Sequence, residues 1–194
     1  MERGEGDARQ RLFVAVPLPA GLRELVRHAQ EALPPSPGVR LLSPEQWHVT
    51  LAFIGEVSAA KAETARMVVE ELPPGMGGEA AIEGFLMLPS AARARVVTLE
   101  LADERGVLRA LFEAVMAGLE AGGVMQREKR PFRAHLTIAR LRIPGAVRPR
   151  YESERARFAV ESVCLFRSEL RREGAVYTVV SRKVFHLGDA DEKL

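Results

Sequence analysis

Two short segments of this chain carry histidine, threonine and alanine in the same order and at the same spacing. They are residues 48–52 (HVTLA) and residues 135–139 (HLTIA). Successive side chains of a β-strand point to opposite faces, so in each segment the histidine, threonine and alanine share one face. Two such strands lying together would present two imidazoles and two hydroxyls to one cleft.

A pair of imidazoles suits general acid–base catalysis. An unperturbed imidazole titrates near about pH 6.5, so one ring of a pair can accept a proton while the other donates one. The hydroxyls of Thr50 and Thr137 can donate hydrogen bonds to phosphate oxygens on which negative charge develops. The pattern therefore favours a phosphodiester substrate, and a strained cyclic phosphate needs the least help to open.

Several other catalytic patterns are missing from the sequence. Two histidines are too few for a zinc site, and neither segment contains Asp, Glu or Cys. The chain has no His-Glu-x-x-His motif, no pair of cysteines, no Gly-x-Ser-x-Gly motif and no glycine-rich phosphate loop. We therefore predict no metal site, and we place His28 and His186 on the surface because they lack a similar context.

The surrounding sequence predicts an α+β fold built around the two histidine strands. Each of them follows a strand–helix unit, and 87 residues separate the two histidines, which indicates an ancient duplication. We expect a bilobal protein, with two pseudo-symmetric lobes of antiparallel strands, outer helices and the active cleft between the lobes. From hydrophobic spacing and turn residues, the expected strands are 11–16, 39–42, 47–53, 80–88, 95–101, the strand of 135–139, 156–165 and 175–185; the expected helices are 20–33, 59–71 and 103–121; a charged turn is expected at 168–174, and 144–153 should be irregular or a short helix.

Strict alternation also assigns the neighbours of the two motifs to faces. It places Phe53 on the apolar face, where we expect it in the core, and we expect the same of Trp47 and Phe132, although each ring is of a kind that stacks on bases. It places Arg140 on the face opposite His135, unless the strand twists or ends there. Arg140 is then either a phosphate contact at the strand end or part of a surface ion pair.

Arginine supplies nearly all of the positive charge in a chain whose net charge is +2. A planar guanidinium suits phosphate, although a coding bias or a heat-adapted surface would give the same composition. Arg130 and Arg133 come just before the second histidine strand, and Arg140 follows its motif. We take these three as candidate phosphate-binding residues, with an ordinary solvated surface as the alternative.

The length of 194 residues fits one domain, which we expect over residues 11–187 between a disordered tail at 1–10 and a mobile tail at 188–194. The chain has no run of about 18 apolar residues and no signal peptide. Its single cysteine, Cys164, lies in an apolar run and reads as a small buried residue. These features predict a cytoplasmic protein without a membrane partner, and a cleft complete within one chain predicts a monomer.

The paired motifs resemble the double His-x-Thr-x signature of the two-histidine phosphoesterases. The wider segments resemble the RNA 2′,3′-cyclic phosphodiesterases of bacteria and archaea, also called 2′-5′ RNA ligases, from about residue 11 to residue 185. One departure is Ala134, where the family often has proline. The segments that carry the resemblance are F-x-A at 13–15 followed by Pro17 or Pro19, W-H-x-T-L-x-F-x-G at 47–55, P-F-x-x-H-x-T-I-A-R at 131–140, L-F-x-S-x-L at 165–170 and G-x-x-Y at 174–177.

This resemblance implies hydrolysis of a terminal 2′,3′-cyclic phosphate on RNA to a 2′-phosphomonoester, without metal or nucleotide cofactor. It implies that His48 is the proton donor to the departing 3′ oxygen and that His135 is the proton acceptor that activates water. It also implies that Thr50 and Thr137 hold the phosphate, and that the reverse reaction forms a 2′-5′ RNA link. The partner would be RNA with such ends, tRNA-like or oligoribonucleotide. From the residues alone, either histidine fits either role.

Two other functions stay open on the residues. One is a phosphodiesterase of small cyclic nucleotides, nucleotide-sugar cyclic phosphates or 2′-5′ oligonucleotides, which activity on mononucleotides and oligomers would separate. The other is an RNA-end binding module without turnover. The presence of both histidines and both threonines favours an enzyme over the binding module.

Overall fold

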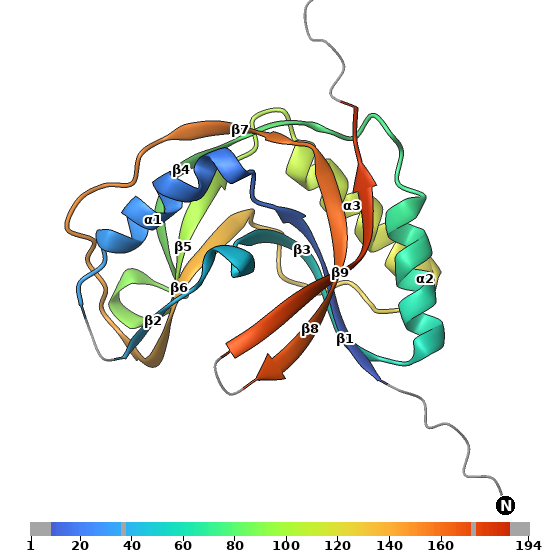
Figure 1. Cartoon of the computed structure of the whole chain (residues 1–194), viewed down its shortest axis with the longest axis horizontal. Helices are drawn as coiled ribbons and strands as arrows, with labels where there is room; N and C mark the ends of the chain where they lie inside the picture. The colour runs from blue at the N-terminus through green and yellow to red at the C-terminus, as the bar shows by residue number, and fades with distance from the viewer. Residues whose placement is uncertain (1–8, 36–37, 172–173, 187–194) are drawn as a thin grey trace, which may run out of the picture.

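The computed structural model describes residues 9–35, 38–171 and 174–186 (Figure 1). Within these ranges it has nine strands, three α-helices and three short 3-10 helices. The strands are β1 (Gln10–Pro17), β2 (Val39–Leu41), β3 (His48–Val57), β4 (Gly78–Leu88), β5 (Ala94–Ala102), β6 (His135–Gly145), β7 (Ala156–Val160), β8 (Ser162–Arg171) and β9 (Gly174–Val184). The helices are η1 (Ala20–Leu22), α1 (Arg23–Glu31), η2 (Pro44–Gln46), α2 (Ala59–Glu70), η3 (Ala91–Arg93) and α3 (Val107–Ala121).

All strands join one antiparallel sheet in the order β7-β4-β5-β6-β3-β1-β8-β9, with β2 added on β6. The predicted α+β class is therefore confirmed. The two histidine strands, β3 and β6, are neighbours in the middle of the sheet. On its other side β3 pairs with β1, the strand before α1, and β6 pairs with β5, the strand before α3. The order matches the predicted duplication, although one sheet runs through both halves.

The helices pack against the sheet through apolar stripes at helical spacing. In Figure 1, α2 and α3 lie together at one side of the sheet, and their contacts run to β1, β8 and β9 for α2 and to β3 and β4 for α3. Helix α1 packs against β6. Ser58 caps α2 by accepting a hydrogen bond from the main chain of Lys61, as its position before the helix predicts. The buried stripe of α3 includes Leu108, Leu111, Val115 and Leu119.

The structure corrects four details of the expected elements. The strand expected at 156–165 is two strands, β7 and β8, interrupted at Glu161, and the charged turn expected at 168–174 is largely strand, because β8 continues to Arg171. Helix α3 begins at Val107 rather than at Asp103, whose carboxylate instead accepts hydrogen bonds from two main-chain amides of the first turn. Met67, which apolar spacing within the expected helix at 59–71 assigns to the buried stripe, is 46% exposed.

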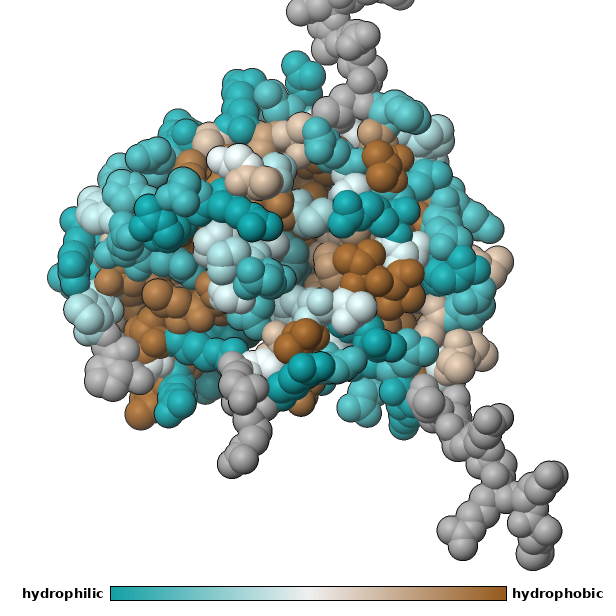
Figure 2. Space-filling view, in the orientation of Figure 1, coloured by the Kyte–Doolittle hydropathy of each residue, from teal (hydrophilic) through white to brown (hydrophobic). Residues whose placement is uncertain are grey.

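Other expectations concern the ends and the surface of the chain. The predicted tails lie outside the described residues, except for Arg9 and for Gln10, which is already in β1. Cys164 is buried as predicted, and burial raises the pKa of its thiol. His28 and His186 are exposed as expected. Hydrophilic residues cover most of the face in Figure 2, and no helix of the described part is long and apolar enough to cross a membrane.

Candidate active site

The two histidine strands lie antiparallel at the centre of the sheet, with Val49 opposite Leu136. These two residues are buried, as the alternation predicts. On the other face, His48, Thr50, His135 and Thr137 are each only partly buried. The fold thus brings the two motifs together, and all four polar side chains line cavities on that face.

Each histidine strand contains a β-bulge at the same position of its motif. In the pairing of β3 with β1, Leu51 has no partner residue, and in the pairing of β6 with β5, Ile138 has none. A bulge adds one unpaired residue, so side chains beyond it exchange faces. The fifth residue after each histidine therefore turns from the core face to the cleft face.

Phe53 and Arg140 occupy this fifth position, and the face that strict alternation predicts for each of them is wrong. Phe53 is 48% exposed rather than in the core, and the guanidinium of Arg11 lies 4.9 Å from the centre of its ring. Arg140 lies on the same side as His135, and no carboxylate among the described residues forms an ion pair with it. Phe53, Arg140 and Thr50 line the cavities on both sides of the site.

Trp47 and Phe132 differ from Phe53. Trp47 is buried in the core, as expected, and its indole N–H donates to the carbonyl of Leu42 at 3.1 Å. Phe132 is partly buried and stacks on Phe112 at 4.4 Å between ring centres. Both rings of this pair line the cavity beside His135, so that side of the cleft has an apolar wall.

His48 stands among aromatic rings contributed by both ends of the chain. Its ring centre lies 4.7 Å from that of Phe13, 5.3 Å from Tyr177 and 6.1 Å from Phe166. These surroundings lower the pKa of His48 to about 4. Loss of hydration is the largest cause, and the charges of Arg140 and His135 act in the same direction, whereas a hydrogen bond with the main chain of Gln46 opposes them. In the ligand-free protein at pH 7, the imidazole of His48 is therefore neutral.

His135 stands beside polar groups. Its Nδ1 lies 2.7 Å from the carbonyl oxygen of Arg133, two residues earlier in the chain. The ring of His48 likewise forms a hydrogen bond with the main chain two residues before it. A carbonyl oxygen only accepts, so Nδ1 carries the hydrogen and the neutral ring keeps a bare Nε2. Glu100 lies opposite His135 on β5 and pairs with the guanidinium of Arg133 at 2.6 Å.

The predicted basic residues before the second motif have different surroundings. Arg130 and Arg133 both line the cavity beside His135, but the charge of Arg133 is offset by Glu100. Arg127, which belongs to the same basic run, pairs with Glu113 at 2.6 Å and lies over the ring of Phe112. Arg130 and Arg133 therefore stay predicted phosphate or RNA contacts.

Two residues at or beside the site were not predicted from the sequence. Gln30, on α1, is buried and its Nε2 donates to the carbonyl oxygens of Leu42 at 2.7 Å and of Ile138, the bulged residue of β6, at 2.8 Å. Arg40, on the three-residue strand β2, lies directly opposite Arg140 and lines the His48 cavity. Neither residue lies in a recognisable motif. The one indication in the sequence is that Gln30 is a polar residue within the apolar stripe of α1.

The cleft has two connected parts and no metal-binding cluster. The part beside His48 has a volume of about 370 Å³ and the part beside His135 about 340 Å³. Among residues 9–35, 38–171 and 174–186, no three His, Cys, Asp or Glu side chains are grouped to hold a metal ion. The chemistry available from the described side chains is proton transfer by two imidazoles and binding of an anion by hydroxyls and guanidinium groups.

Comparisons with known proteins agree with this geometry. A family model described as LigT-like phosphoesterase matches residues 16–98 and again 99–177, once for each motif. An Archaeoglobus fulgidus protein named RNA 2′,3′-cyclic phosphodiesterase is 31% identical over 173 residues, covering 86% of this chain and 96% of that one. A Thermus thermophilus protein of the same name is 33% identical over 184 residues, covering 89% and 88%.

Solved structures share the fold over nearly their whole length. A Thermus thermophilus crystal structure superposes with a TM-score of 0.75 at 30% identity, covering 90% of this chain and 97% of that one. Escherichia coli LigT in complex with 3′-AMP gives a TM-score of 0.71 at 28% identity, covering 91% and 98%.

Proposed function

The chain belongs to the LigT-like phosphoesterases, and on that premise we propose that it hydrolyses the terminal 2′,3′-cyclic phosphate of RNA to a 2′-phosphomonoester. The observation that carries the proposal is the pairing of two His-x-Thr strands at the centre of one sheet, close enough for the charge of His135 to act on His48. The names of the relatives support the same reaction.

In the proposed mechanism, the cyclic phosphate lies between the two histidines. Thr50 and Thr137 donate hydrogen bonds to its non-bridging oxygens, and Arg140 offsets the negative charge that develops there. The Nε2 of His135 accepts a proton from water, which attacks phosphorus, and His48 gives a proton to the departing 3′ oxygen. The terminal base rests against the exposed ring of Phe53 and the apolar wall formed by Phe112 and Phe132.

The role of His48 as proton donor places a requirement on the complex. Its pKa of about 4 keeps it neutral in the ligand-free protein, which by itself suits a base better than an acid. A bound phosphate brings negative charge next to the ring and offsets the charge of Arg140, so it raises the pKa of His48. If it did not, the roles of the two histidines would be exchanged, with the same overall reaction.

Ligation would be the same ring opening with the 5′-hydroxyl of a second RNA in place of water. The same two histidines would then activate a 5′-hydroxyl and protonate the departing 3′ oxygen of the ring, joining two RNA ends by a 2′-5′ link. Excess water favours hydrolysis, so we propose ligation as a secondary activity.

The test is hydrolysis of an oligoribonucleotide with a 2′,3′-cyclic phosphate end in the presence of EDTA, with 2′- and 3′-phosphate products resolved. We expect the wild type to form the 2′-phosphate, and His48→Ala and His135→Ala to form almost none. His28→Ala is the matched control, because His28 is exposed and lines neither part of the cleft. A strict metal requirement, or full activity of either site variant, would refute the mechanism.

A further inference from the structure

One buried hydroxyl beside His48 has no role in the proposed reaction. Ser168, on β8, is 8% exposed, and it lines the part of the cleft beside His48 together with Tyr177 of β9. The two residues lie directly opposite one another in the pairing of β8 with β9. Both belong to segments that carry the family resemblance, L-F-x-S-x-L at 165–170 and G-x-x-Y at 174–177.

Ser168 differs from the other buried polar side chains of the described residues. Its hydroxyl forms no hydrogen bond with any residue of those ranges. The other four each have a partner: Gln30 with Leu42 and Ile138, Thr98 with Leu86, Ser162 with Cys164, and Ser181 with Glu70. No side-chain oxygen or nitrogen that is closed off from solvent lacks a partner in the described part of the chain. The oxygen of Ser168 is therefore reachable from the cavity, where it favours a polar ligand.

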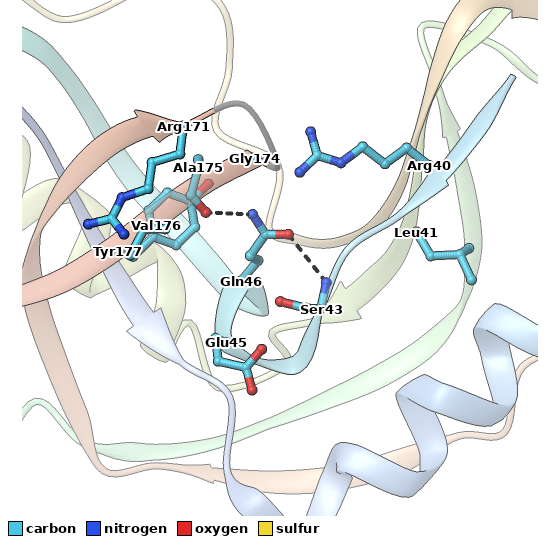
Figure 3. A pocket seen from close by; sticks show the side chains of 10 residues that line it. All are labelled: Arg40, Leu41, Ser43, Glu45, Gln46, Arg171, Gly174, Ala175, Val176 and Tyr177. Atoms are coloured by element: carbon cyan, nitrogen blue, oxygen red, sulfur yellow. Dashed lines mark hydrogen bonds between the residues drawn. The ribbon is translucent and has the colours of Figure 1, made fainter.

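The hairpin that carries Ser168 is tied to the chain just before His48. Gln46 donates from Nε2 to the carbonyl of Ala175 on β9 at 2.8 Å, and its Oε1 accepts from the main chain of Ser43 at 3.3 Å (Figure 3). Because Gln46 comes two residues before His48, these hydrogen bonds set the position of the hairpin relative to the histidine strand. The fold thus holds the hydroxyl of Ser168 at a fixed place in the cleft.

Strand spacing limits which part of a nucleotide Ser168 can contact. In the sheet, β1 separates β8 from β3, so Ser168 stands two strand spacings, about 9–10 Å, from the backbone of the strand that carries His48. The strand that carries His135 is one spacing further. A phosphate held between the two histidines is therefore too far for a hydrogen bond with the short side chain of Ser168, and the nucleoside attached to that phosphate is the group within its range.

Phe53 divides the nucleoside between the two parts of the cleft. It lines both parts, and the guanidinium of Arg11, which lines only the part beside His48, lies over its ring at 4.9 Å. That face of the ring is thus covered, so a base stacks on the opposite face, next to Phe112 and Phe132. The part beside His48 is left for the sugar, whose departing 3′ oxygen receives the proton of His48.

A ribose that carries a 2′,3′-cyclic phosphate has one exocyclic oxygen left, on its 5′ carbon, because the 2′ and 3′ oxygens are both in the phosphate ring. The 5′ carbon is carried by the ring carbon next to C3′, whereas the base is carried by the ring carbon next to C2′. The 5′ oxygen therefore lies on the same side of the nucleotide as the departing oxygen, which is the side of His48.

We propose that the hydroxyl of Ser168 binds this 5′ oxygen by a hydrogen bond and so holds the sugar with its 3′ oxygen towards His48. The 5′ oxygen is a hydroxyl in a mononucleotide and an ester oxygen in RNA, and a serine hydroxyl can donate to both. This inference rests on the proposed function and adds to it a residue that recognises the sugar.

The test pairs Ser168→Ala with a substrate that lacks the 5′ oxygen. The substrates are adenosine 2′,3′-cyclic phosphate and 5′-deoxyadenosine 2′,3′-cyclic phosphate. For the wild type we expect kcat/KM to be about three- to tenfold lower on the second, the range for one hydrogen bond. Ser168→Ala should show the same loss on the first substrate and no further loss on the second. The loss should appear mainly in KM, because the contact is made away from the reacting bond.

Ser181→Ala is the matched control. Ser181 is also 8% exposed, but its hydroxyl donates to the carboxylate of Glu70 at 3.0 Å and it lines neither part of the cleft. We expect Ser181→Ala to lower the midpoint of chemical unfolding and to leave kcat/KM unchanged. Ser168→Ala should do the reverse, because its hydroxyl has no hydrogen bond to a described residue to lose.

The inference is overturned if the wild type has equal kcat/KM on both substrates, or if Ser168→Ala loses the same factor on both. Either result leaves the proposed function intact. Absence of turnover on both substrates would instead refute the proposed function, and binding then decides about Ser168. The probes are adenosine 2′-phosphate and 5′-deoxyadenosine 2′-phosphate, titrated by calorimetry. A three- to tenfold weaker Kd for the second probe, seen in the wild type and absent in Ser168→Ala, would support the contact, and equal Kd values in the wild type would overturn it.

Discussion

His48 and His135 occupy the same place in two copies of one strand motif, but their surroundings differ. Both rings bond a main-chain group two residues earlier, and both strands bulge three residues after the histidine. His48 is packed among Phe13, Phe166 and Tyr177, whereas His135 stands near the ion pair of Arg133 and Glu100. The backbone fixes the geometry of the pair, and the aromatic surroundings of His48 lower the pKa of that ring.

The same contrast appears five residues after each histidine. The bulges carry Phe53 and Arg140 onto the cleft face at equivalent positions, so one copy offers a ring and the other a charge. A duplicated scaffold can thus acquire different functions in its two halves through single side chains, while the strands themselves stay alike.

The comparison of the two histidines depends most strongly on both being needed for catalysis. We expect His48→Ala and His135→Ala each to lower kcat by about a thousandfold, within the range for loss of a general acid or base. Because the two act in one step, the double variant should lose little more than either single variant. Single-turnover rates for the three variants measure this, with thermal unfolding to check the fold. Strictly multiplicative losses would mean that the histidines act in separate steps.

The lowered pKa of His48 gives the next largest effect. In NMR titrations of the ligand-free protein, His48 should titrate near pH 4. Saturating inorganic phosphate should raise its pKa by one unit or more, roughly the effect of a charge at close range. A pKa of His48 that stays near 4 in the phosphate complex would instead assign the proton donor role to His135.

The same shift makes stability depend on pH. The folded state holds His48 neutral, so the unfolded state binds more protons between about pH 4 and the ordinary value of 6.5. The free energy contributed by neutral His48 is fully present above pH 6.5 and is lost as the pH falls towards 4. Denaturant unfolding across this window should show the slope in the wild type and a smaller slope in His48→Gln.

The comparison of Phe53 with Arg140, five residues after the two histidines, can be tested through the contact of Phe53 with a base. Phe53→Ala should lower kcat/KM for a cyclic nucleotide about five- to tenfold, because stacking of a base on an aromatic ring contributes at least about 1 kcal/mol. Phe53→Tyr should behave like the wild type. Ribose 2′,3′-cyclic phosphate lacks the base and serves as the control substrate. An equal loss on both substrates would show that Phe53 acts on the scaffold rather than on the base.

The smallest expected effect concerns the support of the second bulge. Gln30→Met removes the two hydrogen bonds to the carbonyls of Leu42 and Ile138. The carbonyl of Leu42 still accepts from the indole of Trp47, and the carbonyl of Ile138 still accepts from the main-chain amide of Leu42. We expect the free energy of unfolding to fall by about 1 kcal/mol, the usual value for lost hydrogen bonds that leave no orphaned group. Chemical denaturation measures it, with the exposed Gln126→Met as control. An unchanged stability would contradict this support role.

Periodicity was sufficient to predict most of the strands and helices, since their apolar residues recur with periods of two or about 3.6. The repeated motif was sufficient to bring the two histidines into one site. The bulges at Leu51 and Ile138 were not predictable, because an inserted residue leaves no mark on composition and inverts the alternation beyond it. This single cause misplaced both Phe53 and Arg140.

Arg40 and Gln30 were missed for another reason. Arg40 lies on a strand of three residues, too short for any pattern, and its place in the cleft depends on the pairing of β2 with β6, which is distant in sequence. Gln30 acts through the carbonyl of a residue on another strand. Such roles are properties of pairs of segments, which only the folded chain brings together.

The aromatic cage of His48 also bears on how the protein is made. Phe13 comes from near the start of the chain, while Phe166 and Tyr177 come from near its end, where β8 pairs with β1 through contacts such as Leu12 with Arg167. On the ribosome, both His-x-Thr segments emerge before β8 and β9 have been synthesised. Until then His48 lacks the rings of Phe166 and Tyr177, so the surroundings that lower its pKa are complete only after the last two strands have been added.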